Sequence, residues 1–116
     1  MVLALAVLVA MVAIPASAVV VSFPDPGLEV HIRRVIGKPT EDIHDTDLLG
    51  LTELDATGSS IASLEGIQYC VDLTVLWLYE NEIVDISALS SLTTLDSLGL
   101  GSNQIVDIGV LSGLTN

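Results

Sequence analysis

The side chains of this chain most able to do chemistry are its carboxylates, and two of them recur in equivalent places. Asp85 and Asp107 follow the same dipeptide, Ile-Val, and each stands just before a similar apolar run. Carboxylate oxygens are ligands that Ca²⁺ prefers, but a calcium site needs several more of them. The alternative is that each aspartate caps the helical turn that follows it. Capping is the favoured interpretation, also for Asp45 and Asp47, and the sequence predicts no metal site.

The one cysteine and the two histidines do not form a catalytic pattern. Cys70 occupies a position that Leu92 and Leu114 fill elsewhere, so it is predicted to be a small buried hydrophobe. His31 and His44 are not spaced as partners of a nucleophile or as metal ligands. The sequence also contains no GxSxG, HExxH, P-loop or dinucleotide motif. It therefore predicts neither an enzyme nor a cofactor.

These side chains sit in a repeating unit that occurs three times without a gap, at 51–72, 73–94 and 95–116. Positions 1, 4, 6, 11, 14, 17 and 20 of every copy hold an apolar residue or Cys. A spacing of two is typical of a strand, and a spacing of three of a 3₁₀ turn. Each copy is thus predicted to be a short strand, a corner and a tight helical return. Copies stacked side by side would form a parallel sheet on one face.

Asparagine recurs at position 9, as Asn81 and Asn103, with Ser59 in the first copy. The chain turns off the strand there and leaves backbone amides that need partners. An inward Asn both donates and accepts hydrogen bonds, so the pattern predicts a ladder of Asn81 and Asn103 that links neighbouring coils.

Residues 19–50 are predicted to cap the open end of the first coil. Asp25 and Pro26 are typical of a helix start, and Gly37 of a stop, which predicts a helix over 26–36. Its expected apolar stripe is Leu28, Ile32, Val35 and Ile36. A second, short helical turn is expected between residues 40 and 50.

The segment 1–18 is almost wholly apolar and ends in Ala16-Ser17-Ala18, a small-residue cleavage pattern. It is interpreted as a signal peptide, with a membrane anchor as the alternative. Both place the remainder outside the cell. Fifteen acidic residues face three basic ones, a net charge of −12. Such a charge opposes phosphate backbones, so no nucleic-acid partner is predicted.

The repeat LxxLxLxxNxIxxIxxLxxL resembles the leucine-rich repeat of bacterial internalin-type surface proteins, and the segment from FPDPGLEVHIRRVIGKP onward resembles their N-terminal cap. The resemblance implies an α/β fold: a right-handed solenoid with short parallel strands on its concave face, 3₁₀ turns on its convex face and a helical N-terminal cap. It also implies proteins that bind ligands on the concave face and that are secreted or held at the cell surface. The chain is expected to be truncated at its C-terminal end.

The outward strand positions hold the candidate ligand-binding residues of the concave face: Glu53, Asp55, Val75, Trp77, Tyr79, Glu80, Ser97 and Gly99. An exposed Trp beside a Tyr and carboxylates is typical of a binding hot spot, although such side chains also simply cover a sheet. The predicted function is a non-enzymatic, extracellular protein-binding module with an unidentified protein partner. Membrane contact is expected only through the signal segment or a missing C-terminal anchor. The alternative is a structural spacer or targeting arm of a larger cell-surface enzyme or adhesin.

Overall fold

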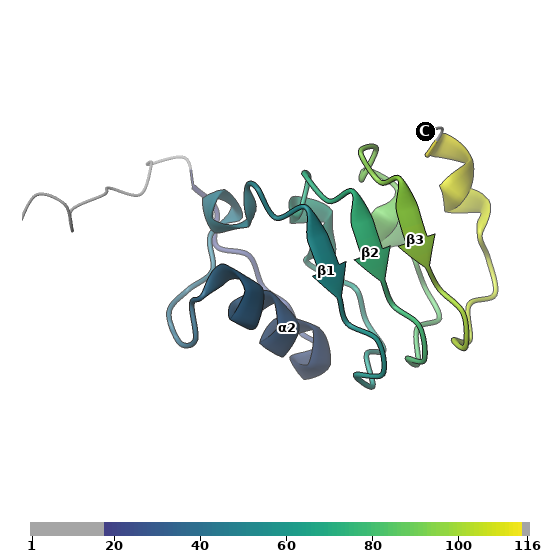
Figure 1. Cartoon of the computed structure of the whole chain (residues 1–116), viewed down its shortest axis with the longest axis horizontal. Helices are drawn as coiled ribbons and strands as arrows, with labels where there is room; N and C mark the ends of the chain where they lie inside the picture. Colours follow the sequence, from purple (N-terminus) through teal and green to yellow (C-terminus); the bar gives the residue numbers. More distant parts are fainter. Residues whose placement is uncertain (1–17, 115–116) are drawn as a thin grey trace, which may run out of the picture.

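The computed structural model describes residues 18–114, which form a cap followed by three stacked coils (Figure 1). The signal-peptide prediction falls outside these residues, apart from Ala18 itself. Among the described residues, no helix has the length and apolar character needed to cross a membrane.

Three short strands form a parallel sheet in the order β1-β2-β3. They are β1 (Glu53–Asp55), β2 (Val75–Trp77) and β3 (Ser97–Gly99). The register pairs Leu54 with Leu76 and Leu76 with Leu98, so equivalent residues of successive copies lie side by side. The predicted solenoid with one strand per repeat is confirmed.

Each strand is followed by a return segment that carries a short 3₁₀ helix on the opposite side of the coil (Figure 1). These are η2 (Ile67–Tyr69), η3 (Ser87–Leu89) and η4 (Gly109–Gly113). In the first copy the apolar spacing of three already begins at Ile61, yet the 3₁₀ helix of that copy starts only at Ile67. The spacing therefore marks burial along the whole return, while only its last part is helical.

The repeated apolar positions form the core between the sheet and the returns. In the first two copies all of them are buried. In the third copy only Leu95 is buried; Leu98, Leu100 and Ile105 are half-buried, and Ile108 is 64% exposed. The exposure of Ile108 follows from the place of this coil at the end of the stack, because no further coil packs against it among the described residues.

The cap contains helix α2 (Pro26–Ile36) and the 3₁₀ helix η1 (Asp45–Leu48). Helix α2 begins after Asp25 and ends before Gly37, which has a left-handed backbone conformation, so both boundaries match the prediction. Leu28 and Ile32 are buried, but Val35 is 51% exposed. Val35 therefore does not belong to the apolar stripe, which runs along one side of α2 through the residues four apart.

The residues just after Ala18 belong to the cap. The Val21 amide donates to the Ile43 carbonyl at 2.8 Å, and the Asp45 amide donates to the Val19 carbonyl at 2.9 Å. Further on, Phe23 is buried against Gly66 in the return of the first coil. The segment from Val19 is thus hydrogen-bonded to the rest of the cap, and Phe23 packs against the first coil.

Helix α2 is held against the first coil by side-chain bonds. One oxygen of Asp25 caps the helix, and its other oxygen accepts from the amides of Ala62 and Ser63 at 2.8 and 3.1 Å. Nε2 of His31 lies 2.7 Å from Oγ of Ser59. Ser59 is the residue that replaces Asn in the first copy, so this position faces the cap where the later copies face another coil.

Candidate binding surface

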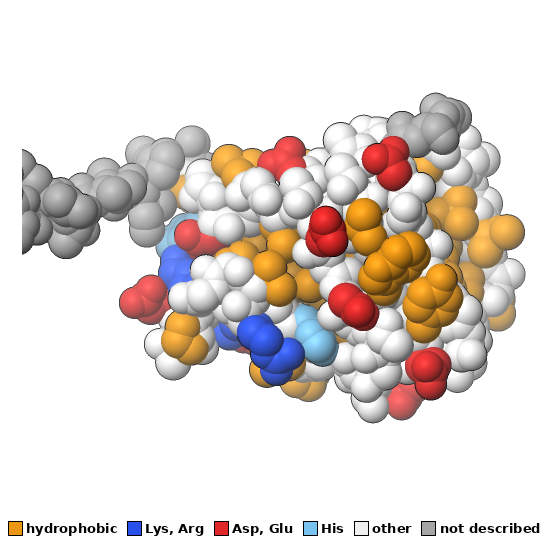
Figure 2. Space-filling model, in the orientation of Figure 1, with side chains coloured by type: hydrophobic (Ala, Val, Ile, Leu, Met, Phe, Trp, Pro, Cys, Tyr) orange, Lys and Arg blue, Asp and Glu red, His pale blue; other side chains and the backbone are white. Residues whose placement is uncertain are grey.

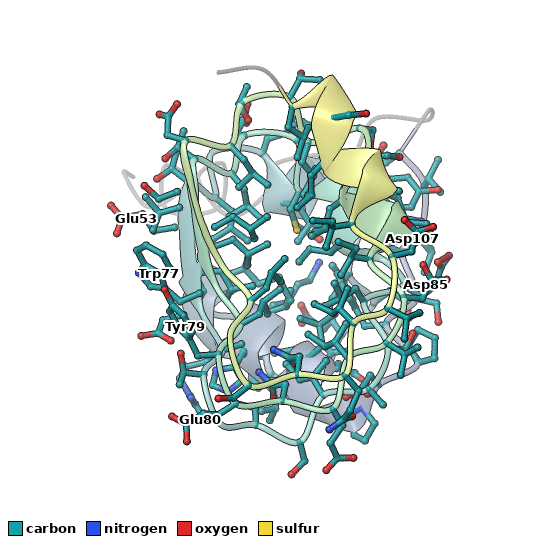
Figure 3. The ribbon with its side chains drawn as sticks, turned by 90° about the vertical axis from the view of Figure 1, so that its right-hand side faces the viewer. Glu53, Trp77, Tyr79, Glu80, Asp85 and Asp107 are labelled. Atoms are coloured by element: carbon teal, nitrogen blue, oxygen red, sulfur yellow. The ribbon has the colours of Figure 1, made fainter. Side chains whose placement is uncertain are left out.

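The outward side chains of the sheet share one surface, which we call the strand face. Figure 3 shows Glu53, Trp77, Tyr79 and Glu80 projecting from the sheet, with Asp85 and Asp107 on the opposite side of the coils. In Figure 2 apolar side chains gather over β2 and β3 with acidic side chains around them. The strand face consists of Glu53, Asp55, Val75, Trp77, Tyr79, Glu80 and Ser97.

Two aromatic rings form the centre of the strand face. The centroids of Trp77 and Tyr79 are 5.9 Å apart, and their planes meet at 22°, so the rings are stacked. Tyr79 is 42% exposed and Trp77 is half-buried. Stacking in this geometry limits the rotamers of both rings, so a partner would meet a pre-ordered aromatic pair.

Gly99 is not part of the exposed surface, contrary to the sequence-based prediction. It is buried, because the Tyr79 ring lies over it; a Cβ built on Gly99 would be 2.3 Å from Cε2 of that ring. Gly101 lies under the same ring, with a Cβ distance of 3.2 Å to Cδ1. The two glycines form the floor on which Tyr79 rests. Their recurrence in LGLG (98–101), where the second copy has LWLY (76–79), was the sequence signal for this role.

The carboxylate of Asp55 stands directly beside the aromatic pair. Asp55 is the register partner of Trp77 in the parallel sheet. Hydrogen bonds from the Thr57 hydroxyl and amide hold the pKa of Asp55 below its ordinary value, with the amide at 3.1 Å. Asp55 is therefore ionised at neutral pH.

Glu80 follows Tyr79 in an unusual backbone conformation. Its φ is +59°, in the left-handed region that β-carbon-bearing residues rarely adopt. The equivalent residues are Gly58, with φ +65°, and Ser102, with φ +59°. All three coils thus turn in the same way after the strand. Gly58 was the only signal of this in the sequence, and Glu80 holds a strained position at the edge of the strand face.

Beneath the strand face, Asn81 and Asn103 link the coils. Oδ1 of Asn81 accepts from the Ser59 and Ile61 amides, both at 2.9 Å, and Nδ2 donates to the Ala56 carbonyl at 2.9 Å. Oδ1 of Asn103 accepts from the Ile83 amide at 3.0 Å. Asn81 is buried, so its bonds satisfy backbone groups that water does not reach.

On the opposite side, the aspartates hold turns. Asp85 accepts from the Ser87 amide at 2.8 Å, and Asp107 from the Gly109 amide at 2.8 Å; these are the first residues of η3 and η4. The Ser87 bond lowers the pKa of Asp85. Within residues 18–114 no three His, Cys, Asp or Glu side chains are grouped as a metal site would need.

Cys70 is buried in the core, and loss of solvation raises the pKa of its thiol to about 12. A thiol with that pKa is protonated at neutral pH and is a poor nucleophile.

A hollow of about 350 Å³ lies between the end of α2 and the start of β1. It is lined by Val35, Ile36, Asp47, Leu49, Gly50, Leu51, Thr52 and Glu53. Only Glu53 belongs to the strand face, and the aromatic pair lies outside the hollow. Trp77 and Tyr79 instead lie on the outer side of the sheet (Figure 3).

Comparison with known proteins shows which proteins these coils resemble. No protein-family profile matches the chain. Internalin H of Listeria monocytogenes is 39% identical over 69 residues, which are 58% of this chain and 13% of that protein. The crystal structure of an internalin (inlF) from the same species superposes with a TM-score of 0.78 and 41% identity, over 81% of this chain and 28% of that one. The chain carries an internalin-type leucine-rich-repeat domain.

The internalin-type domain is also similar to part of a larger chain from Clostridium perfringens. The structure of the CBM51-2 and INT domains of ZmpB matches with a TM-score of 0.63 and 31% identity, over 78% of this chain and 19% of that chain. The present chain thus spans less than a third of each of these three relatives.

Proposed function

We propose that this internalin-type domain is a non-enzymatic module that binds a protein through its strand face. The observation that carries the proposal is the stacked, solvent-accessible Trp77–Tyr79 pair on an open sheet surface. Trp and Tyr are enriched among the few residues that dominate binding energy at protein interfaces. Because the two stacked rings are already ordered before binding, less conformational entropy is lost on association.

We further propose that the domain acts outside the cell, secreted or at the cell surface. The similarity to internalins, together with the resemblance of segment 1–18 to a signal peptide, supports this location. The two aromatic residues and the carboxylates of the strand face would then meet an extracellular protein.

The proposal is tested by screening purified extracellular protein domains against the immobilised chain. Four versions are compared: the wild type, Trp77→Ala, Tyr79→Ala, and a control, Val84→Ser/Val106→Ser, which changes two exposed residues away from the strand face. Retention of a domain by the wild type and the control, with loss in both aromatic variants, is the expected result. A bound domain that is indifferent to Trp77 and Tyr79 would refute binding by this face.

The second candidate is a targeting or spacer arm of a larger protein. The similarity to the ZmpB chain, in which INT domains accompany CBM51-2, favours it. In that case the strand face need not bind anything, and the domain would set the position of its neighbours. Screening would then return no domain that depends on the aromatic pair, while the length of the arm would affect the activity of the parent protein.

A further inference from the structure

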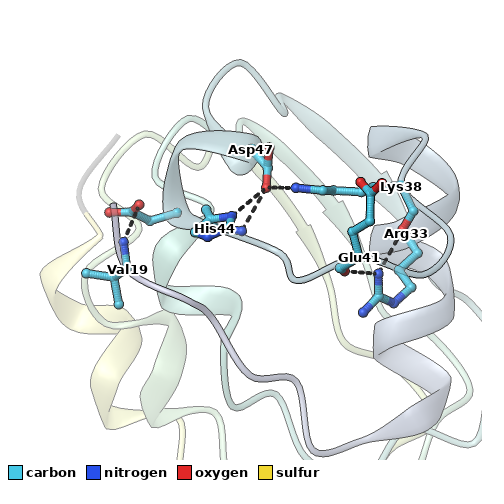
Figure 4. Close-up of polar contacts among 7 residues, drawn as sticks. Val19, Arg33, Lys38, Glu41, His44 and Asp47 are labelled. Atoms are coloured by element: carbon cyan, nitrogen blue, oxygen red, sulfur yellow. Dashed lines mark hydrogen bonds and ion pairs between the residues drawn. The ribbon is translucent and has the colours of Figure 1, made fainter. Parts of the chain in front are cut away.

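The positive charges of this chain are concentrated in the cap. Arg33, Arg34 and Lys38 are its only basic residues, and residues 39–116 contain no Lys or Arg. Nη1 of Arg33 donates to the carbonyls of Lys38 and Glu41, each at 2.8 Å, and Nζ of Lys38 pairs with Asp47 at 2.8 Å (Figure 4). Two of the three cations are therefore engaged within the cap.

The carboxylates of the strand face take part in none of these ion pairs, although bonds from Thr57 and, after them, His31 of the cap lower the pKa of Asp55. In the described part of the chain, the ion pairs join residues of the cap alone. Glu53, Asp55 and Glu80 are exposed, and Asp55 is held in its ionised form. The strand face thus carries negative charge that no basic side chain of the coils offsets, and a positively charged partner would be electrostatically complementary to it.

An aromatic pair between carboxylates favours one kind of cation. The face of an indole ring attracts a positive charge, more strongly for Trp than for Tyr or Phe. Asp55 is the register partner of Trp77, so its backbone is one strand spacing, about 4.8 Å, from the Trp77 backbone. A guanidinium is planar, stacks on rings and pairs with carboxylates in a fork, which an ammonium does not do.

We propose that the partner of the strand face presents arginine, whose guanidinium stacks on the Trp77–Tyr79 pair and pairs with the neighbouring carboxylates. This inference rests on the proposed function and names the chemistry of the partner: an arginine-rich segment of a protein. Glu53 and Asp55 border the aromatic pair on the β1 side, and Glu80 follows Tyr79 at the end of β2. Arginines spaced along one segment would reach both sides of the pair.

The probe is a short arginine-rich peptide with blocked ends, titrated calorimetrically into the whole chain at low salt. The matched variants are Glu53→Gln/Asp55→Asn on the strand face and Asp85→Asn/Asp107→Asn on the opposite side. Each removes two charges from the net −12, and Asn keeps an oxygen for the turn amides that the aspartates bind. The strand-face pair and Trp77→Ala should each weaken binding about tenfold, while the opposite pair should change it less than about twofold.

A lysine peptide of the same length should bind more weakly than the arginine peptide, because an ammonium cannot stack and fork. Equal weakening by the two double variants would show a general attraction to an acidic protein and would overturn the inference. So would equal affinity for the two peptides, or no binding of the arginine peptide. These results leave the proposed function to its own test: a screened domain that needs Trp77 and Tyr79 but offers no arginine would support binding and refute only the arginine chemistry.

Discussion

The carboxylate of Asp25 accepts a hydrogen bond of 2.8 Å from the amide of Ala62, 37 residues further along the chain. Its other oxygen accepts from Gly27 and Leu28 and so caps α2. One side chain therefore starts the cap helix and ties it to the first coil. Burial would raise the pKa of Asp25, but its bonds to the Ala62, Ser63, Leu28 and Gly27 amides lower it overall.

Asp25→Asn is expected to separate these two roles. Asn has a single carbonyl oxygen, so either the helix amides or the amides of Ala62 and Ser63 lose their acceptor. The free energy of unfolding should fall by about 1–3 kcal/mol, since an amide left without a partner in a part-buried site is costly. For Asp25→Ala the free energy of unfolding should be lower by about another 1 kcal/mol, because the helix cap is lost as well. Urea unfolding of the three proteins measures this.

The dependence of stability on acid pH tests the role of the Asp25 charge. The pKa of Asp25 is lowered on folding from an ordinary 3.8, so its contribution is complete above that pH and is lost as the pH falls through the folded-state value. The stability difference between the wild type and Asp25→Asn should therefore shrink below about pH 3.8. A constant difference down to pH 2 would show that the charge of Asp25 is irrelevant.

Asn81→Ala should destabilise the solenoid by about 1–3 kcal/mol, because buried amides and carbonyls of two coils lose their partner. Asn103→Ala is the matched control. Its side chain is half-buried and accepts from one amide, that of Ile83, where Asn81 accepts from two. Its cost should be smaller. Equal costs in chemical unfolding, or an unchanged melting temperature for Asn81→Ala, would contradict the ladder as a source of stability.

Gly99→Ala should move the Tyr79 ring and break its stacking on Trp77, because the new Cβ would overlap the ring. The exposed ring can swing into water, so stability should change by less than about 1 kcal/mol. Trp77 is the only tryptophan, so its fluorescence spectrum reports the change directly. Gly101→Ala, with its wider contact, should alter the spectrum less. In a Tyr79→Ala background both substitutions should leave the fluorescence spectrum of Trp77 unchanged. An effect of Gly99→Ala that persists there would show another cause.

Glu80→Gly should raise stability by about 1 kcal/mol, because a left-handed φ costs a residue with a Cβ but not glycine. Ser102→Gly has the same φ and should give a similar gain. If Glu80 is retained for binding, only Glu80→Gly should also weaken the arginine peptide. Thermal unfolding and peptide titration are measured together. A Glu80→Gly protein that is no more stable than the wild type would remove the argument from strain.

The apolar spacing predicted most of the fold because a repeat imposes the same geometry three times. Leu54, Leu76 and Leu98 had to lie in one row once the repeat period was recognised, and Asp25-Pro26 with Gly37 marked both ends of α2. What the sequence could not show depends on contacts between coils. Gly99 reads as an outward strand residue, and only the position of the Tyr79 ring buries it.

The same limit explains the other differences. Val35 has the spacing of the apolar stripe, but the first coil reaches only the side of α2 that carries Leu28 and Ile32. Ile108 has the type and spacing of a core residue but lacks a neighbouring coil among the described residues. The second role of Asp25 joins distant segments, and no local pattern announces it.

Quenching of the single tryptophan by ions tests the central claim most directly. Trp77 lies on an accessible face of uncompensated negative charge. At low ionic strength the ratio of caesium to iodide quenching should therefore exceed the ratio measured for free N-acetyltryptophanamide, and added salt should reduce the excess. Glu53→Gln/Asp55→Asn should also reduce it. A caesium-to-iodide quenching ratio equal to that of free N-acetyltryptophanamide, or no quenching by either ion, would contradict an open acidic strand face around Trp77.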